Sequence, residues 1–266
     1  AWENGWVKPI RPPVERGESV AIIGAGPGGL AAADVLRRKG YQVTVYDRYD
    51  RAGGLLTYGI PGFKLEKPVV MQRVEQLESA GVNFVLNCTV GEDISFDAIR
   101  GQHDAVLIAT GVYKARDIEA PGVGAAGIVK ALDYLTASNR KGFGDEVPDY
   151  DSGALNASGK RVVVIGGGDT AMDCVRTAIR QNAQSVKCLY RRDRANMPGS
   201  QREVQNAEEE GVEFVWLAAP KGFTGGTDVE GVMVQKMRLG APDATGRQSP
   251  EVIEGADYVE PADLVI

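Results

Sequence analysis

Two glycine-rich loops, each between an apolar segment and a helical pattern, are the parts of this sequence best suited to chemistry. The first has the spacing G-x-G-x-x-G and consists of Gly24, Ala25, Gly26, Pro27, Gly28 and Gly29. In such a loop the first glycine allows a tight turn, the second lets the backbone approach a pyrophosphate, and the third lets the helix pack closely on the strand. The free N–H groups and the dipole of the helix N-terminus favour the anion. The loop therefore predicts a dinucleotide site.

The charge that follows the first loop indicates which dinucleotide is bound. The next apolar segment ends in Asp47, about twenty residues after the loop. A carboxylate at this position hydrogen-bonds the ribose hydroxyls and repels a 2′-phosphate. The first site is therefore predicted to hold FAD or NAD rather than NADP.

The second loop has the opposite charge after it. It is a G-x-G-x-x-A variant that consists of Gly166, Gly167, Gly168, Asp169, Thr170 and Ala171. Its second strand ends in Tyr190-Arg191-Arg192, and two guanidinium groups can hold a 2′-phosphate through bidentate, charge-assisted hydrogen bonds. This site predicts NADPH, and a solvated arginine pair is the alternative. Arg194 either joins the phosphate cluster or lies on the surface.

Two segments between the loops can also approach a nucleotide closely. Residues 51–56 (RAGGLL) can bring bare backbone against the phosphate and ring of a flavin. The pattern of residues 107–111 (LIATG) predicts a strand that ends in the small residues Ala109, Thr110 and Gly111. Each segment alone could be an ordinary turn or strand end, but their order in the chain supports a nucleotide site.

The elements that must position these loops form one pattern twice. A strand at 19–23, a helix at 30–39 and a strand at 42–47 are repeated by a strand at 161–165, a helix at 169–181 and a strand at 186–190. The other expected elements are helices at 67–80, 129–138 and 200–210, strands at 83–86, 105–109, 213–217 and 262–266, short antiparallel strands within 221–259, and a loop at 141–159. The final strand has nothing after it, which suggests a truncated chain.

This duplication predicts an α/β protein with two Rossmann-like dinucleotide-binding domains, the glutathione-reductase-like FAD/NAD(P) fold. We expect residues 18–125 to form the FAD-binding domain and residues 126–266 to form the NADPH-binding domain. Residues 1–17 are rich in proline and charge, so they are expected to be a linker.

Composition and charge exclude several classes of function. The 266 residues carry a net charge of −6 and no basic cluster, so neither nucleic acid nor a membrane surface is indicated as a partner. No apolar run approaches the roughly 20 residues of a membrane span. The acidic run 208–210 is expected to be a solvated helix face.

Cysteine and histidine usage argues against an intrinsic dithiol or metal centre. Cys88, Cys174 and Cys188 are widely spaced and form no CxxC, which fits a reducing cytoplasm and argues against a metal knuckle. The single histidine, His103, is expected on the surface rather than in catalysis. We therefore predict no catalytic side chain and no metal ligand in this chain.

An acid-ended site and an arginine-ended site in one chain imply two different dinucleotides. This is the arrangement of a flavoenzyme in which NADPH reduces FAD. The cofactors then supply the chemistry, so the protein needs no general acid or base of its own.

Four segments carry a family resemblance. AIIGAGPGGLAAADVLRRKG, GGLLTYGIPGFKL, VLIATG and VVVIGGGDTAMDCVRTAIR, in this order, resemble the small (beta) subunits of NADPH-dependent glutamate synthases. Dihydropyrimidine dehydrogenases are similar over the same modules. The resemblance covers residues 2–266, and AWENGWVKP resembles the segment after the family's N-terminal iron–sulfur domain. We therefore expect a chain truncated at both ends.

The resemblance implies a longer electron path. In that family NADPH reduces FAD, and electrons pass through [4Fe–4S] clusters to an FMN on the large (alpha) subunit, where 2-oxoglutarate and glutamine-derived ammonia become glutamate. It implies a cytoplasmic hetero-oligomer whose clusters lie only in the upstream domain and the partner subunit. The family's FAD contacts match Ala25, Pro27, Gly28, Asp47, Arg48, Gly54, Leu55, Lys64 and Val90. Its NADPH contacts match Gly167, Gly168, Asp169, Thr170, Arg191 and Arg192.

Three alternatives remain at the level of sequence. One is another NADPH-dependent flavin reductase, of the dihydropyrimidine dehydrogenase or ferredoxin–NADP reductase type. A second is a non-catalytic scaffold that has kept the fold, although the retained Asp47, Arg191 and Arg192 argue against it. A disulfide reductase of the thioredoxin reductase type is disfavoured because its dithiol is missing.

Overall fold

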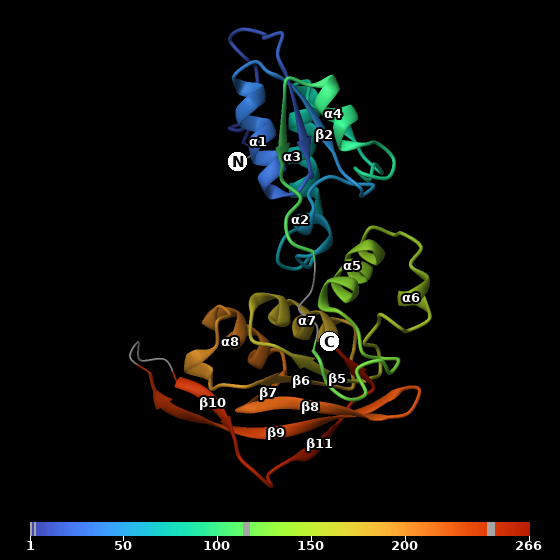
Figure 1. Ribbon diagram of the computed structural model, residues 1–266, viewed down its shortest axis with the longest axis vertical. Helices are drawn as coiled ribbons and strands as arrows, with labels where there is room; N and C mark the ends of the chain where they lie inside the picture. The colour runs from blue at the N-terminus through green and yellow to red at the C-terminus, as the bar shows by residue number, and fades with distance from the viewer. Residues whose placement is uncertain (1, 3, 114–117, 244–247) are drawn as a thin grey trace. The chain divides into compact units, whose positions relative to one another are not determined.

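The chain forms two compact units, residues 1–114 and 115–266, in a computed structural model that describes residues 2, 4–113, 118–243 and 248–266 (Figure 1). The predicted domain boundary between 125 and 126 lies further along the chain than this division. The assignment of one cofactor to each domain stays a prediction.

Unit 1 is a four-stranded parallel sheet with helices around it. Its elements are β1 (Ser19–Ile23), α1 (Pro27–Arg38), β2 (Gln42–Tyr46), α2 (Leu55–Tyr58), α3 (Lys67–Ser79), β3 (Asn83–Val85), α4 (Phe96–Gln102) and β4 (Ala105–Ile108). The strand order is β3-β2-β1-β4, and every neighbouring pair is parallel. The carboxyl ends of β1, β2 and β4 therefore meet at one edge of the sheet, where ligands bind in open α/β folds.

The core of unit 1 lies on both faces of this sheet. Val43 and Val45 of β2 pack in one apolar cluster with residues of α1 and α3. Tyr46 points to the opposite face, where it joins Cys88 and Ile99 in a second cluster. This alternation is what the period of two in a strand requires when both faces are covered.

Unit 2 combines a parallel sheet with an antiparallel one. Its elements are α5 (Ala131–Gly142), α6 (Pro148–Asp151), β5 (Arg161–Ile165), α7 (Asp169–Arg180), β6 (Ser185–Tyr190), the 3₁₀ turn η1 (Arg194–Asn196), α8 (Gln201–Glu209), β7 (Glu213–Trp216), β8 (Ala218–Gly225), β9 (Val229–Pro242), β10 (Gln248–Val252), β11 (Tyr258–Pro261) and β12 (Leu264–Val265). The parallel order is β12-β5-β6-β7. The antiparallel sheet has the order β10-β9-β11, with β8 also paired to β9.

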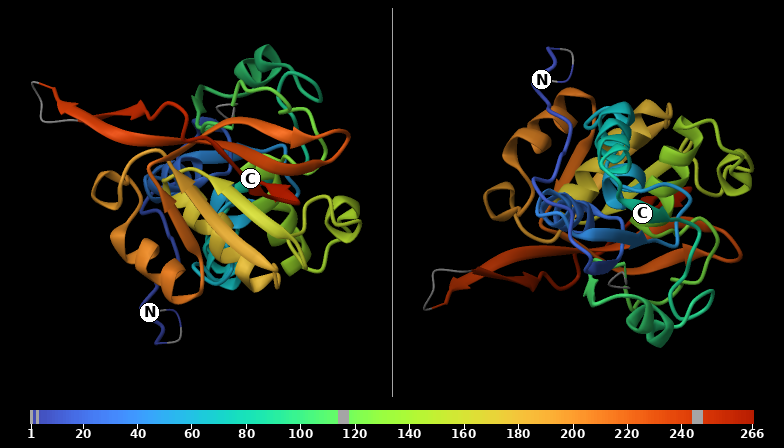
Figure 2. Two further views of the ribbon diagram at one scale, coloured as in Figure 1. Left: turned by 90° about the horizontal axis from the view of Figure 1, so that it is seen from below. Right: turned by 90° about the horizontal axis from the view of Figure 1, so that it is seen from above.

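The two sheets of unit 2 share the buried side chains of β5. Val162 and Val164 pack with the residues of α7 and α8, whereas Val163 packs with the antiparallel sheet. In Figure 1, α7 and α8 accordingly lie on one face of the parallel sheet and β8 and β9 on the other. Figure 2 shows β9 and β10 extending well beyond the parallel sheet.

The repeated strand–loop–helix pattern is confirmed, and the departures are short elements. The two strands that precede the glycine loops have the expected bounds. Three short helices, α2, α4 and α6, are absent from the prediction, and α6 interrupts the loop expected at 141–159. Residues 244–247 of the expected antiparallel region lie outside the described residues.

Three local expectations differ from the structure. The strand expected at 262–266 is only the two-residue β12, which pairs in parallel with β5. His103 is partly buried, its Nε2 lies 3.1 Å from the Tyr46 hydroxyl, and the two rings meet edge to face. In the acidic run 208–210, Glu208 and Glu210 form ion pairs with arginines instead of facing only solvent.

Candidate nucleotide-binding sites

The first glycine loop leaves open space at two of its four glycines. A side chain at Gly24, whose φ is +110°, would collide with the Ala109 carbonyl, and one at Gly29 would collide with the Gly24 carbonyl. The protein's own backbone therefore requires these two glycines. At Gly26 and Gly28 a Cβ atom would meet nothing within 4 Å. These two positions leave a cradle that fits a pyrophosphate at the start of α1.

Asp47 is held directly against this loop. Its Oδ2 accepts the N–H of Ala25 at 2.6 Å, and its Oδ1 accepts the N–H of Tyr49 at 2.9 Å. The preceding carbonyl, that of Tyr46, accepts the N–H of Gly24 at 2.8 Å. A carboxylate has about four acceptor positions, so Asp47 retains capacity for ribose hydroxyls.

Two other predicted segments also reach the first loop. The N–H of Gly53 donates to the Ala25 carbonyl at 2.8 Å, and a Cβ atom on Gly54 would lie 2.7 Å from the Gly26 Cα. Gly54 also has a positive φ of 54° and precedes α2, which begins at the predicted contact Leu55. The structure therefore brings residues 53–55 and Ala109 to the same loop, as the prediction of one site requires.

The remaining predicted contacts of unit 1 lie in different surroundings. Thr110 and Gly111 follow β4, and Gly111 has a positive φ of 69°. Lys64 is exposed, with its N–H bonded to the Pro61 carbonyl, and Val90 packs against the cluster of Tyr46 and Cys88. Their contact with a nucleotide stays a prediction.

An aromatic cluster beside Arg48 was not predicted. The Arg48 guanidinium lies 5.0 Å from the ring centroid of Tyr49 and 4.5 Å from that of Tyr113, and the two tyrosine rings lie 6.1 Å apart. The ring of Tyr58 lies against that of Tyr49, with the centroids 5.1 Å apart and the planes tilted by 39°. Burial is the largest cause that raises the pKa of Tyr58 to about 12. Tyr49 stands only two residues after Asp47, a spacing that could have drawn attention to it.

The second loop is tied to its second strand by the same backbone hydrogen bond as the first, and it also contacts an aromatic ring. Gly166 has a φ of +155°, and its N–H donates to the Leu189 carbonyl at 3.1 Å. A side chain at Gly167 would collide with the ring of Tyr190. Gly168 precedes α7, and a Cβ atom there would meet nothing within 4 Å. Gly168 is therefore the glycine of this loop that leaves room for a pyrophosphate.

The predicted arginine pair stands directly after β6. Arg191 is exposed and Arg192 is partly buried. The Nε of Arg192 is buried, and among the described residues it has no hydrogen-bond partner. A buried donor without an acceptor is unfavourable, so this atom fits a phosphate oxygen. Arg194 instead forms an ion pair with Glu208 at 2.8 Å, which favours the surface alternative.

Asp169, Thr170 and Ala171 begin α7, where the first N–H groups of a helix are free. Asp169 Oδ1 accepts the N–H of Ser200 at 3.0 Å. The segment after the arginine pair is therefore tied to the start of α7. Sequence reasoning missed Ser200 and its neighbours, because they lie about thirty residues from the loop and match no nucleotide-binding motif.

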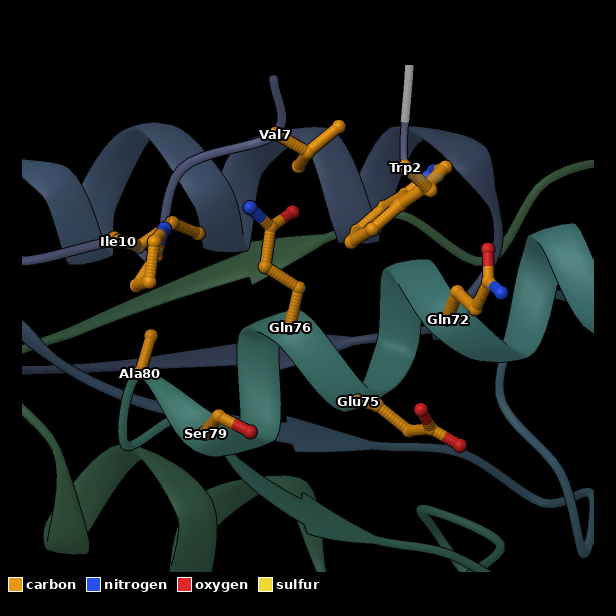
Figure 3. A pocket seen from close by; sticks show the side chains of 9 residues that line it. Trp2, Val7, Ile10, Gln72, Glu75, Gln76, Ser79 and Ala80 are labelled. Atoms are coloured by element: carbon orange, nitrogen blue, oxygen red, sulfur yellow. The ribbon is translucent and has the colours of Figure 1, made fainter. Parts of the chain in front are cut away.

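Unit 1 also has a cavity of about 510 Å³ between the N-terminal segment and α3 (Figure 3). None of the predicted nucleotide-binding residues lines it. Its walls are formed by Trp2, Val7, Pro9, Ile10, Gln72, Glu75, Gln76, Ser79 and Ala80. Gln76 helps to hold the segment in place, since its Nε2 donates to the Lys8 carbonyl at 2.7 Å.

The structure also shows how the potential metal ligands and the thiols are placed, and whether a helix could span a membrane. In the part of the chain that the structure describes, no cluster of three histidine, cysteine or acidic residues could hold a metal ion. All three cysteines are buried and unpaired. No helix formed by the described residues is long and apolar enough to span a membrane.

Residues 18–243 match the family model described as pyridine nucleotide-disulphide oxidoreductase. The chain belongs to this family. The match spans both glycine loops and both charged strand ends, so the predicted α/β fold with two Rossmann-like modules is confirmed.

Named relatives confirm the resemblance seen in the sequence. The whole chain is 82% identical to the putative glutamate synthase [NADPH] small chain of Cereibacter sphaeroides and covers 64% of that protein. It is 67% identical, again over its whole length, to the glutamate synthase [NADPH] small chain of Azospirillum brasilense, of which it covers 55%. The chain therefore spans only about three fifths of these relatives.

A solved structure supports the fold independently. FprA from Mycobacterium tuberculosis, solved in complex with NADPH, matches with a TM-score of 0.78 at 21% identity, over 94% of this chain and 70% of that one. At this identity the likeness concerns the fold alone.

Proposed function

We propose that this chain is the FAD- and NADPH-binding core of a glutamate synthase small subunit. The observation that carries the proposal is the opposite charge after the two glycine loops, Asp47 in one and Arg191 with Arg192 in the other. The names of the relatives support the same activity. The chain would then receive a hydride from NADPH on FAD and pass the electrons onward.

The FAD site is proposed at the loop of Gly26 and Gly28, with Asp47 on the ribose. The open space at the two glycines supports this, as does the fixed carboxylate of Asp47. The proposed contacts are Gly24, Ala25, Gly26, Pro27, Gly28, Gly29, Asp47, Arg48, Gly54, Leu55, Lys64, Val90, Ala109, Thr110 and Gly111.

The NADPH site is proposed at the loop of unit 2, with Arg192 and Arg191 on the 2′-phosphate. The unpartnered Nε of Arg192 supports this, because a phosphate oxygen would satisfy it. The proposed contacts are Gly166, Gly167, Gly168, Asp169, Thr170, Ala171, Arg191 and Arg192. Bound FAD and NADPH supply the redox chemistry, so the side chains of this chain bind and orient.

The onward path is proposed from the same relatives. Electrons would leave through [4Fe–4S] clusters held outside this chain and reach a large subunit that forms L-glutamate from 2-oxoglutarate and glutamine. The protein would accordingly act as a cytoplasmic hetero-oligomer with that subunit.

Anaerobic titration of the full-length protein with NADPH tests the proposal. We expect a yellow protein whose flavin absorption is bleached by NADPH, and glutamate formation once the large subunit is added. Dithionite, which needs no coenzyme site, serves as the control reductant for the flavin. A colourless protein that cannot be reconstituted with FAD would refute the flavin site. A flavin reduced by dithionite but not by NADPH would refute the coenzyme site.

A further inference from the structure

Tyr190 occupies the same place in unit 2 that Asp47 occupies in unit 1. In unit 1, the N–H of Gly24 donates to the carbonyl of Tyr46, the residue before Asp47. In unit 2, the N–H of Gly166 donates to the carbonyl of Leu189, the residue before Tyr190. A neutral side chain therefore stands where the first site has its carboxylate, which removes the repulsion of a 2′-phosphate.

Tyr190 contacts the glycine loop with its ring and a second segment with its hydroxyl. The ring covers Gly167 so closely that a Cβ atom there would overlap it. The hydroxyl donates to the Asn196 carbonyl at 2.9 Å. On another side, the ring meets Trp216 edge to face, with centroids 6.4 Å apart. The side chain thus has three partners that fix its orientation.

The segment that Tyr190 reaches, residues 193–200, is itself closed onto the loop. Asp193 Oδ1 accepts both the N–H and the Nδ2 of Asn196, at 3.0 and 2.7 Å. The N–H of Gly199 donates to the Gly167 carbonyl at 2.8 Å. Arg191 and Arg192 therefore lie between two points that are both tied to the glycine loop.

These contacts also orient the carbonyl groups of the loop. The Gly166 carbonyl accepts the Cys188 thiol at 3.3 Å, the Gly167 carbonyl accepts Gly199, and the Gly168 carbonyl accepts the N–H of Ala171 at 3.0 Å. All three carbonyls thus have donors within the protein. Among the described residues, no backbone acceptor lies against the N–H groups of Gly167 and Gly168. Such an arrangement presents donors to an anion.

We propose that Tyr190 is a positioning residue of the coenzyme site, which couples the pyrophosphate loop to the arginine pair through Gly167 and Asn196. The inference rests on the proposed NADPH site and deepens it. Fixing both phosphate-binding regions at one separation lets a single coenzyme use both at once, which increases affinity without any new contact to the ligand.

Calorimetric binding of two probes to the full-length protein tests this role. NADP⁺ spans both phosphate-binding regions, whereas 2′-AMP contacts only the arginine end. In Tyr190→Phe, which keeps the ring, we expect NADP⁺ to bind about fivefold more weakly, the usual effect of one net hydrogen bond, and 2′-AMP to change by less than about twofold. Tyr258→Phe removes the same group elsewhere in unit 2 and should leave both affinities unchanged.

The ring contact has its own test. In the otherwise native protein, Gly167→Ala should weaken NADP⁺ strongly, and in a Tyr190→Leu background the same change should add little, because the colliding ring is gone. If Gly167→Ala weakens NADP⁺ equally in the native and the Tyr190→Leu backgrounds, the inference is overturned. It is also overturned if Tyr190→Phe weakens NADP⁺ and 2′-AMP by the same factor. If the unmodified protein fails to prefer NADP⁺ over NAD⁺, the proposed NADPH site itself is refuted. If the preference stands and the Tyr190 variants bind normally, only the role of Tyr190 is refuted.

Discussion

Removal of the arginine pair should shift the coenzyme preference of the full-length protein away from NADPH. Arg192 has a buried Nε without a partner among the described residues, so a 2′-phosphate oxygen would give it a charge-assisted hydrogen bond. Such bonds contribute about 1.5–3 kcal/mol, so Arg192→Ala should weaken NADPH by about 10-fold to 150-fold. Arg191 is exposed, so solvent screening should limit its effect to a few-fold.

The assay is anaerobic reduction of the flavin, with NADPH and NADH titrated separately. For Arg191→Ala combined with Arg192→Ala we expect NADPH affinity to fall by about 30-fold to 500-fold, with NADH changed by less than about threefold. Arg194→Ala is the matched control, because this guanidinium is already paired with Glu208 and should not contribute. Equal losses for the two coenzymes would refute the assignment of the pair to the 2′-phosphate.

The other predictions concern the loops and the core. Gly29→Ala should abolish flavin binding by displacing the loop backbone, whereas Gly26→Ala should keep the fold and lose only flavin affinity, which flavin content and circular dichroism can compare. The side chain of Arg180 leads the contacts that hold the pKa of Glu210 at about 2, below the ordinary 4.5. The ionised Glu210 therefore stabilises the fold fully above about pH 4.5, and this stabilisation is lost as the pH falls toward 2. Glu210→Gln should flatten the Tm–pH curve in this range. Met172 is fully buried, so Met172→Ala should lower the free energy of unfolding by about 2–5 kcal/mol in denaturant titrations.

The parts predicted most reliably from sequence are those fixed by local pattern. The strands before the glycine loops are short apolar runs that stop at a glycine, and that pattern is typical of a buried parallel strand. Asp47 is predicted to hydrogen-bond the ribose at the first loop, and although that contact stays a prediction, the structure places its carboxylate 2.6 Å from the Ala25 nitrogen of this loop. In both cases nearby residues contained the necessary information.

The parts that were missed are a short helix and an ion pair between distant residues. The helix α4 is only seven residues long and has little periodicity, although Ser95, which caps it by accepting the N–H of Ala98 at 3.1 Å, is a local signal that could have revealed it. Arg194 and Arg192 look alike in sequence, and only the presence of Glu208 on α8 distinguishes them. The charge of a residue follows from its own identity, whereas the residue that pairs with it depends on the tertiary fold.

The second position of each glycine motif also has a side-chain neighbour that the local sequence does not indicate. In unit 1 this position is Ala25, and its neighbour across the strand end is Asp47, whose small carboxylate reaches the backbone N–H without occupying the space of the methyl group. In unit 2 the position is Gly167, and its neighbour is the ring of Tyr190, which leaves no room for a methyl group. The additional glycine of the second loop is therefore required by a protein side chain rather than by the coenzyme. A substitution there would affect coenzyme binding through Tyr190, so the effect of a motif glycine on affinity does not by itself identify a ligand contact.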